Sequence, residues 1–164
     1  MEISYSHDFN KKIKKIPKRV VDKFFERLEL FKLNLYNPIL KNHEGASLTI
    51  SMKNLMGIVW DRGYWHRHDL HQCIADFATY RKPTLNVVDA YRVMKQNGPR
   101  GVSTADSVLM KSLIISEDIV AADAAAAKLF GVDPKSIDHI RIAAEMGVGR
   151  IDLDKLKINR IKVA

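Results

Sequence analysis

Residues 108–131, VLMKSLIISEDIVAADAAAAKLFG, decide the fold class of this chain. The leucines and isoleucines at the start of this stretch predict a buried strand over residues 108–116. Ser116 is expected to cap a helix over residues 118–130, and Gly131 to end it. The many alanines would let this helix lie close on a sheet. A strand followed at once by such a helix is typical of an α/β layer.

Strand and helix signals alternate along the rest of the second part of the chain. Asp69 and Asp133 are expected to cap two further helices. A second short buried strand is predicted to end at Asp89. The predicted strands cover residues 47–52, 84–89, 108–116 and 151–163, and the predicted helices cover residues 69–80, 118–130 and 133–147. We therefore predict an α/β fold, a small layered sheet with flanking helices, preceded by an N-terminal helical hairpin.

The chain changes character at residues 41–43, which separates a basic hairpin over 1–40 from an α/β domain over 41–164. Residues 1–43 hold ten Lys and Arg against five Asp and Glu, so they carry +5 of the net charge of +8. The second predicted helix, from about Lys18 to Asn34, has an apolar stripe at Val20, Phe24, Leu28, Phe31 and Leu35. Two helices alone cannot bury this stripe usefully. It needs a sheet or another helix layer against it.

Composition limits the class of protein. Among the 164 residues, 46% are hydrophobic and 28% are charged, which is typical of a globular chain. No apolar run approaches the roughly 20 residues of a membrane span, and the N-terminus lacks the apolar core of a signal peptide. We therefore expect a cytoplasmic protein without a membrane partner. Cys73 is the only cysteine, so the chain cannot form an internal disulfide or a self-contained iron–sulfur cluster.

Clustered histidines suggest a divalent metal site. His66, His68 and His71 precede Cys73 in an H-x-H-x-x-H-x-C array, and neighbouring imidazoles can share a Zn²⁺, Fe²⁺ or Ni²⁺ ion. The fold could add His43 and the strand-end carboxylate Asp89 to this set. The alternative is a polar helix start without a metal.

Other polar residues suggest ligand binding. Lys53 and Asn54 could hold an anion or a carboxylate, and the loop that begins at Asn97 and Gly98 could form a backbone nest for phosphate. Asp123 lies among alanines on a helix expected to pack, so it needs a partner if it is buried. The alternative for Lys53 is a surface lysine, and the alternative for Asn97 and Gly98 is an ordinary loop. Asp123 could simply belong to a packed helix.

Lysines at the bend of the hairpin could contact RNA through its phosphates. They are Lys11, Lys12, Lys14 and Lys15. A solvated basic face that serves solubility is the favoured alternative. The hairpin resembles the start of RelE/ParE-type toxins over residues 5–9, 14–18, 30–31 and 37–38. That resemblance implies a strand and two helices before a catalytic sheet. The chain after His43 does not continue the pattern, so no catalytic residue is carried over.

The second part of the chain resembles the C-terminal part of the family called domain of unknown function 362. The matching stretches are residues 41–43, 45–49, 53–57, His66 with 70–76, 88–90, 97–101, 116–118, 122–124 and 147–149. Many relatives are about twice as long, so the resemblance implies that an N-terminal half is missing here. A second chain, or self-association, could supply it. The activity of the family is not settled.

Three hypotheses follow for function. The first is a truncated domain of this family with a metal- or anion-binding site whose reaction is unknown. The second is a toxin-derived module that binds RNA or a protein without nuclease activity. The third is a rearranged or constructed chimera without a selected function, whose two parts would unfold with poor cooperativity.

Overall fold

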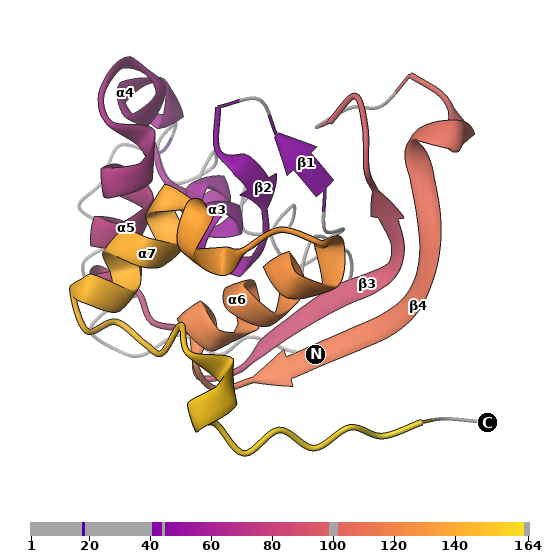
Figure 1. Cartoon of the computed structure of the whole chain (residues 1–164). Coiled ribbons are helices and arrows are strands. Elements are labelled where there is room, and N and C mark those ends of the chain that lie inside the picture. Colours follow the sequence, from indigo (N-terminus) through magenta and orange to yellow (C-terminus); the bar gives the residue numbers. More distant parts are fainter. Residues whose placement is uncertain (1–17, 19–40, 44, 99–101, 163–164) are drawn as a thin grey trace.

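The computed structural model describes Lys18 and residues 41–43, 45–98 and 102–162. Its sheet has four strands in the order β2-β1-β3-β4 (Figure 1). The short strands β1 (Lys41–His43) and β2 (Ser47–Thr49) form an antiparallel hairpin. The long strands β3 (Asn86–Met94) and β4 (Ser107–Ser116) form a second antiparallel pair. The two pairs join where β1 runs parallel to β3, with Lys41 beside Met94.

Helix α6 (Ile119–Phe130) lies in the concave side of the curved β3–β4 ribbon (Figure 1). Its outer side packs on α3 (Ser51–Asn54) and α7 (Asp138–Glu145), and α7 packs on α5 (Leu70–Tyr80). The predicted α/β class, a small sheet with flanking helices, is confirmed. The remaining helical elements are α4 (Arg62–Arg67) and the 3-10 turns Leu55–Ile58, Thr104–Asp106, Pro134–Ser136 and Leu153–Lys155.

The alanines of α6 explain its position at the centre of the molecule. Ala122, Ala124 and Ala126 are fully buried because a helix with such small side chains can approach both the sheet and the outer helices. Asp118 caps α6, since its Oδ1 accepts hydrogen bonds from the amides of Val120 and Ala121. The prediction that Ser116 is the cap was therefore wrong. Gly131 ends the helix with a left-handed φ of 92°, as predicted.

Three predicted strands differ from the observed ones. Residues 151–162 form no strand and include only the 3-10 turn, because no neighbouring strand pairs with their alternating pattern. The strand predicted over 84–89 extends to Met94, so Asp89 lies within β3 and not at its end. The strand predicted over 47–52 stops at Thr49, where the backbone turns into α3.

The predicted burial of β4 is not seen among the described residues, which cover only one face of the β3–β4 pair. Leu113 and Ile115 are exposed on the other face. The predicted hairpin over 1–40 lies outside the described residues. None of the helices in the described ranges has the length and apolar content of a bilayer-spanning segment.

Candidate functional site

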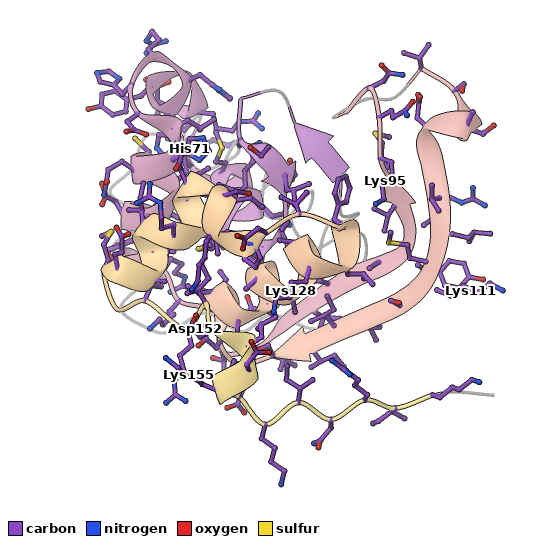
Figure 2. All side chains as sticks on the ribbon, in the orientation of Figure 1. His71, Lys95, Lys111, Lys128, Asp152 and Lys155 are labelled. Atoms are coloured by element: carbon purple, nitrogen blue, oxygen red, sulfur yellow. The ribbon has the colours of Figure 1, made fainter. Side chains whose placement is uncertain are left out.

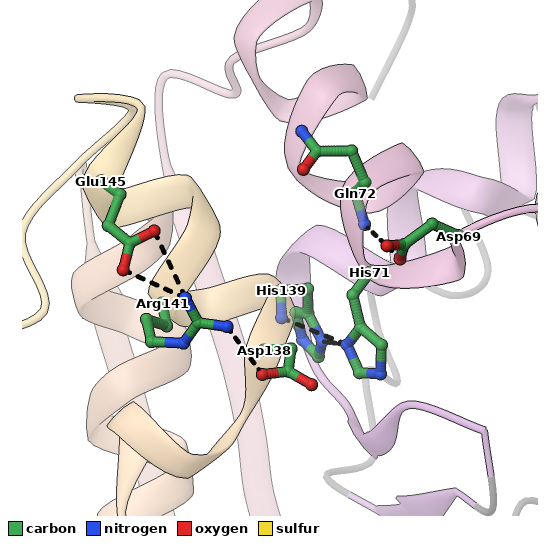
Figure 3. Close-up of polar contacts among 7 residues, drawn as sticks. All are labelled: Asp69, His71, Gln72, Asp138, His139, Arg141 and Glu145. Carbon is green, nitrogen blue, oxygen red and sulfur yellow. Dashed lines mark hydrogen bonds and ion pairs between the residues drawn. The ribbon is translucent and has the colours of Figure 1, made fainter.

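Two histidines from different helices meet at the junction of α5 and α7 (Figure 3). Figure 2 shows the place of one of them, His71, in the whole molecule. The Nδ1 atoms of His71 and His139 are 3.3 Å apart, and their rings are stacked with centroids 5.4 Å apart. His139 is fully buried, whereas His71 is half-buried. Sequence analysis did not single out His139, because an isolated histidine in the first turn of a helix carries no signal of its own.

The local sequence explains why the two helices present these rings to each other. Asp69 caps α5, as predicted, by accepting a hydrogen bond from the amide of Gln72. In α7 the residue at the N-cap position is Ile137, which has no side-chain acceptor. His71 supplies one from α5, since the backbone amide of His139 donates to its Nδ1 at 3.2 Å. One imidazole therefore joins two elements and caps one of them.

Hydrogen bonding fixes which nitrogen of each ring is an acceptor. The Nδ1 of His71 accepts from a backbone amide, so it carries no proton. The Nδ1 of His139 lies 3.3 Å from that same acceptor and can hydrogen-bond to it only as the donor. The Nε2 of His139 is then an acceptor, and it is buried without a hydrogen-bond partner among the described residues. A buried polar atom of this kind is uncommon in folded proteins.

Burial, more than the nearby charges, keeps His139 neutral. Burial lowers the pKa of His139 to about 3, and the nearby His71 and Lys53 add to this effect. Asp138 acts in the opposite direction. Its carboxylate accepts a hydrogen bond from Arg141 at 2.9 Å, which lowers the pKa of Asp138 (Figure 3). Much of its charge is therefore balanced by a guanidinium.

A buried carboxylate positions the element that carries Lys53. Asp123 of α6 is fully buried and accepts hydrogen bonds from the amides of Ser51 at 2.8 Å and Met52 at 3.1 Å. These amides open the first turn of α3, on which Lys53 and Asn54 lie. Asp123 thus has the partner that its burial requires. Its role is to hold α3, and ligand contact by Asp123 stays a prediction.

The other predicted metal ligands lie apart from this pair. His66 on α4 and His68, which directly follows this helix, are exposed, and the ring of His68 stacks on Tyr64. Asp89 accepts a hydrogen bond from the amide of Tyr91 in its own strand. The structure brings no three metal-ligating side chains together within the ranges that it describes. The side chain of His43 is outside those ranges, so a metal site that includes it stays a prediction.

The predicted phosphate loop already holds a carboxylate of the chain. Asn97 donates from Nδ2 to Asp106 at 2.7 Å. The amides of Val102 and Ser103 donate to the other oxygen of Asp106, at 2.6 and 2.9 Å. These hydrogen bonds lower the pKa of Asp106. The observed side-chain contact of Asn97 is therefore with a carboxylate of the chain itself, and Gly98 is buried beside it.

One family model matches the chain. It is described as "Domain of unknown function (DUF362)" and covers residues 8–128, well over half of the 164 residues. The match crosses the boundary that we placed at residues 41–43 and takes most of the N-terminal segment into the same unit. It ends before α7 and His139. No curated protein and no solved structure matches.

The resemblance of residues 1–43 to a toxin hairpin finds no support in these comparisons. The basic residues proposed to contact RNA lie outside the described residues, so that contact stays a prediction. They are Lys11, Lys12, Lys14 and Lys15.

Proposed function

Because the chain belongs to the DUF362 family, which has no known activity to transfer, we propose a function from the geometry alone. The domain binds a small anion that carries a hydrogen-bond donor, at the junction of α3, α5 and α7. The Nε2 of His139 accepts a hydrogen bond from the donor group of the anion, and the ammonium of Lys53 attracts its negative charge. The single observation that carries the proposal is the buried Nε2 of His139, which has no partner among the described residues.

A bare imidazole nitrogen in a buried place needs a donor, because its desolvation otherwise costs about 1–3 kcal/mol. A pKa of about 3 means that His139 does not satisfy Nε2 by taking a proton from water at neutral pH. The missing donor must come from another group. His71 and Lys53, which are both half-buried, form the accessible side of the cluster.

The charge near His139 favours an anion over a cation. The ammonium of Lys53 is close enough to lower the pKa of His139, and it would repel a metal ion there by the same interaction. The nearby carboxylate of Asp138 is paired with Arg141 at 2.9 Å. Inorganic phosphate near neutral pH has both properties that the cluster needs, a negative charge and an O–H donor.

Calorimetric titration of the full chain tests the proposal. Phosphate is expected to bind, while nitrate at the same ionic strength is not, because nitrate has the charge and lacks the donor. Lys53→Met should weaken phosphate binding about tenfold or more, since one charge-assisted hydrogen bond contributes at least 1.4 kcal/mol. His139→Leu should abolish it.

Two exposed residues provide matched controls. Lys82→Met and His68→Leu make the same changes away from the junction and should leave phosphate binding unchanged. Equal binding of phosphate and nitrate would contradict the proposal. So would Zn²⁺ binding that is lost in His139→Leu while phosphate fails to bind, because that result assigns the nitrogen to a metal.

A further inference from the structure

The outer face of the β3–β4 pair exposes apolar side chains. We define it by Val87, Tyr91, Leu113 and Ile115, of which Leu113 and Ile115 are 61% and 60% exposed. Val87 pairs with Ile115 and Asp89 pairs with Leu113 across the two strands, so the apolar residues form a patch around one half-buried carboxylate. The opposite face of the same strands packs on α6. Contiguous exposed apolar surface on a sheet marks a place where another element or molecule binds.

The free edge of β4 is poorly suited to pairing with another strand. The register shifts between Ala90 and Arg92, which leaves Met110 and Lys111 of β4 opposite a single residue of β3. Lys111 has a positive φ of 49° at this bulge. A bulge interrupts the row of hydrogen-bonding groups that an added strand would need. The face of the ribbon is therefore a better docking surface than its edge.

The chain contains a segment whose pattern complements this face. The stripe from Val20 to Leu35 spans about 22 Å in a helix, at about 1.5 Å per residue. The β4 residues from Leu109 to Ile115 span about 20 Å in a strand, at about 3.3 Å per residue. The two apolar surfaces therefore have matching lengths.

The place where this segment joins the sheet supports the same pairing. Residue 40 connects directly to Lys41 of β1, which lies beside Met94 of β3. The segment is thus tethered to the sheet that needs cover, which gives it a high effective concentration there. The family match also includes residues 8–40 together with β3 and β4 in one unit.

We propose that the predicted helix over residues 18–34 docks its apolar stripe on the outer face of β3 and β4. The segment then forms the second helical layer of the sheet, and the chain folds as one unit. This proposal is independent of the anion site, which lies on the other side of α6.

Thiol labelling of the full chain tests the docking. Leu113→Cys is introduced with Cys73→Ser, so that it is the only thiol, and its maleimide reaction rate is measured. The rate is expected to be at least tenfold below that of Thr104→Cys, an exposed position on the loop between the strands. Phe24→Asp with Leu28→Asp should raise the rate at position 113. Arg19→Asp, on the other side of the predicted helix, should leave it unchanged.

Dilution distinguishes docking of the segment within one chain from cover of the face by a second copy. Protection of position 113 that is constant between micromolar and nanomolar protein supports docking within one chain. Protection that disappears on dilution means that a second copy covers the face, and this overturns the proposal. Equal rates at positions 113 and 104 in the intact chain overturn it as well.

Cross-linking keeps the test valid if the aspartate variants fail to fold. A bis-maleimide of about 10 Å should join Leu28→Cys and Leu113→Cys within one chain that otherwise retains its apolar stripe. Products that link only different chains would contradict the proposal.

Discussion

Asp123 and His139 are buried titratable residues that affect stability in opposite directions. Burial raises the pKa of Asp123 to about 7, although the amides of Met52 and Ser51 act to lower it. The folded protein therefore keeps the carboxyl proton of Asp123 over a pH range in which the unfolded chain, with a carboxyl pKa near 4, has lost it. The stabilisation is complete below about pH 4 and is lost as pH rises through about 7. His139, with its lowered pKa, stabilises the fold above about pH 6.5 and less as pH falls.

Asp123→Asn removes the titrating carboxyl and so isolates its contribution to the pH dependence of stability. The free energy of unfolding of the wild type, minus that of the variant, should fall by about 1.4 kcal/mol per pH unit between about pH 4 and 7. Urea denaturation at four pH values measures this difference. The exposed Asp154→Asn serves as the control and should give a flat difference. A flat difference for Asp123→Asn as well would show that the carboxyl is ionised throughout.

The candidate site was only partly predictable from sequence at the residue scale. His71, Lys53 and Asp123 were singled out because of local patterns. Their partners were not, since the amides bonded to Asp123 and the ring facing His71 lie about 70 positions away in the chain. Local spacing grouped His71 with His66 and His68, whereas helix packing places it against His139.

At the scale of elements, β4 shows how a strand can be recognised while its environment is not. Its apolar composition predicts a strand correctly, but apolar residues on both faces do not reveal that one face lacks cover among the described residues. Capping signals at Asp69 and Gly131 depend on the nearest few residues, so these predictions were confirmed. Asp133 caps only the 3-10 turn Pro134–Ser136, so the helix predicted over residues 133–147 is divided, and α7 begins separately at Asp138. The strand predicted from the alternating pattern after residue 151 does not form, because a strand exists only when a neighbouring strand pairs with it.

The bulge in β4 yields a stability prediction. Lys111 holds a positive φ of 49°, where a side chain costs energy and glycine does not. Lys111→Gly should therefore be neutral or stabilise the fold by up to about 1 kcal/mol, whereas the β-branched Lys111→Val should destabilise it by about 1–2 kcal/mol. Urea denaturation of both variants checks this order.

The neighbouring Ser112 gives the matched control for the bulge. Ser112→Gly changes a strand residue outside the positive-φ region and should cost about 0.5–1 kcal/mol. If Lys111→Gly costs as much as Ser112→Gly, the backbone at Lys111 does not require a positive φ.

At the scale of the whole molecule, the family match extends across the predicted division of the chain. The change in composition at residues 41–43 suggested two unrelated parts, because charge and glycine content differ on the two sides. The match from residue 8 to residue 128 runs through that boundary. Composition indicates which residues are exposed to solvent, but it does not indicate which segments pack into one core. The proposed helical cover lies within the matched residues, whereas the proposed anion site also uses α7, which follows them in the chain.

The structure holds His139 neutral with an acceptor at Nε2. The ring nitrogen shifts of ¹⁵N-labelled full-length protein, assigned with His139→Leu and followed from pH 5 to 8, test it most directly. We expect a proton on Nδ1 of His139, none on Nε2, and no titration of His139 between pH 5 and 8. A proton on Nε2, or titration of His139 near pH 6.5, would contradict it.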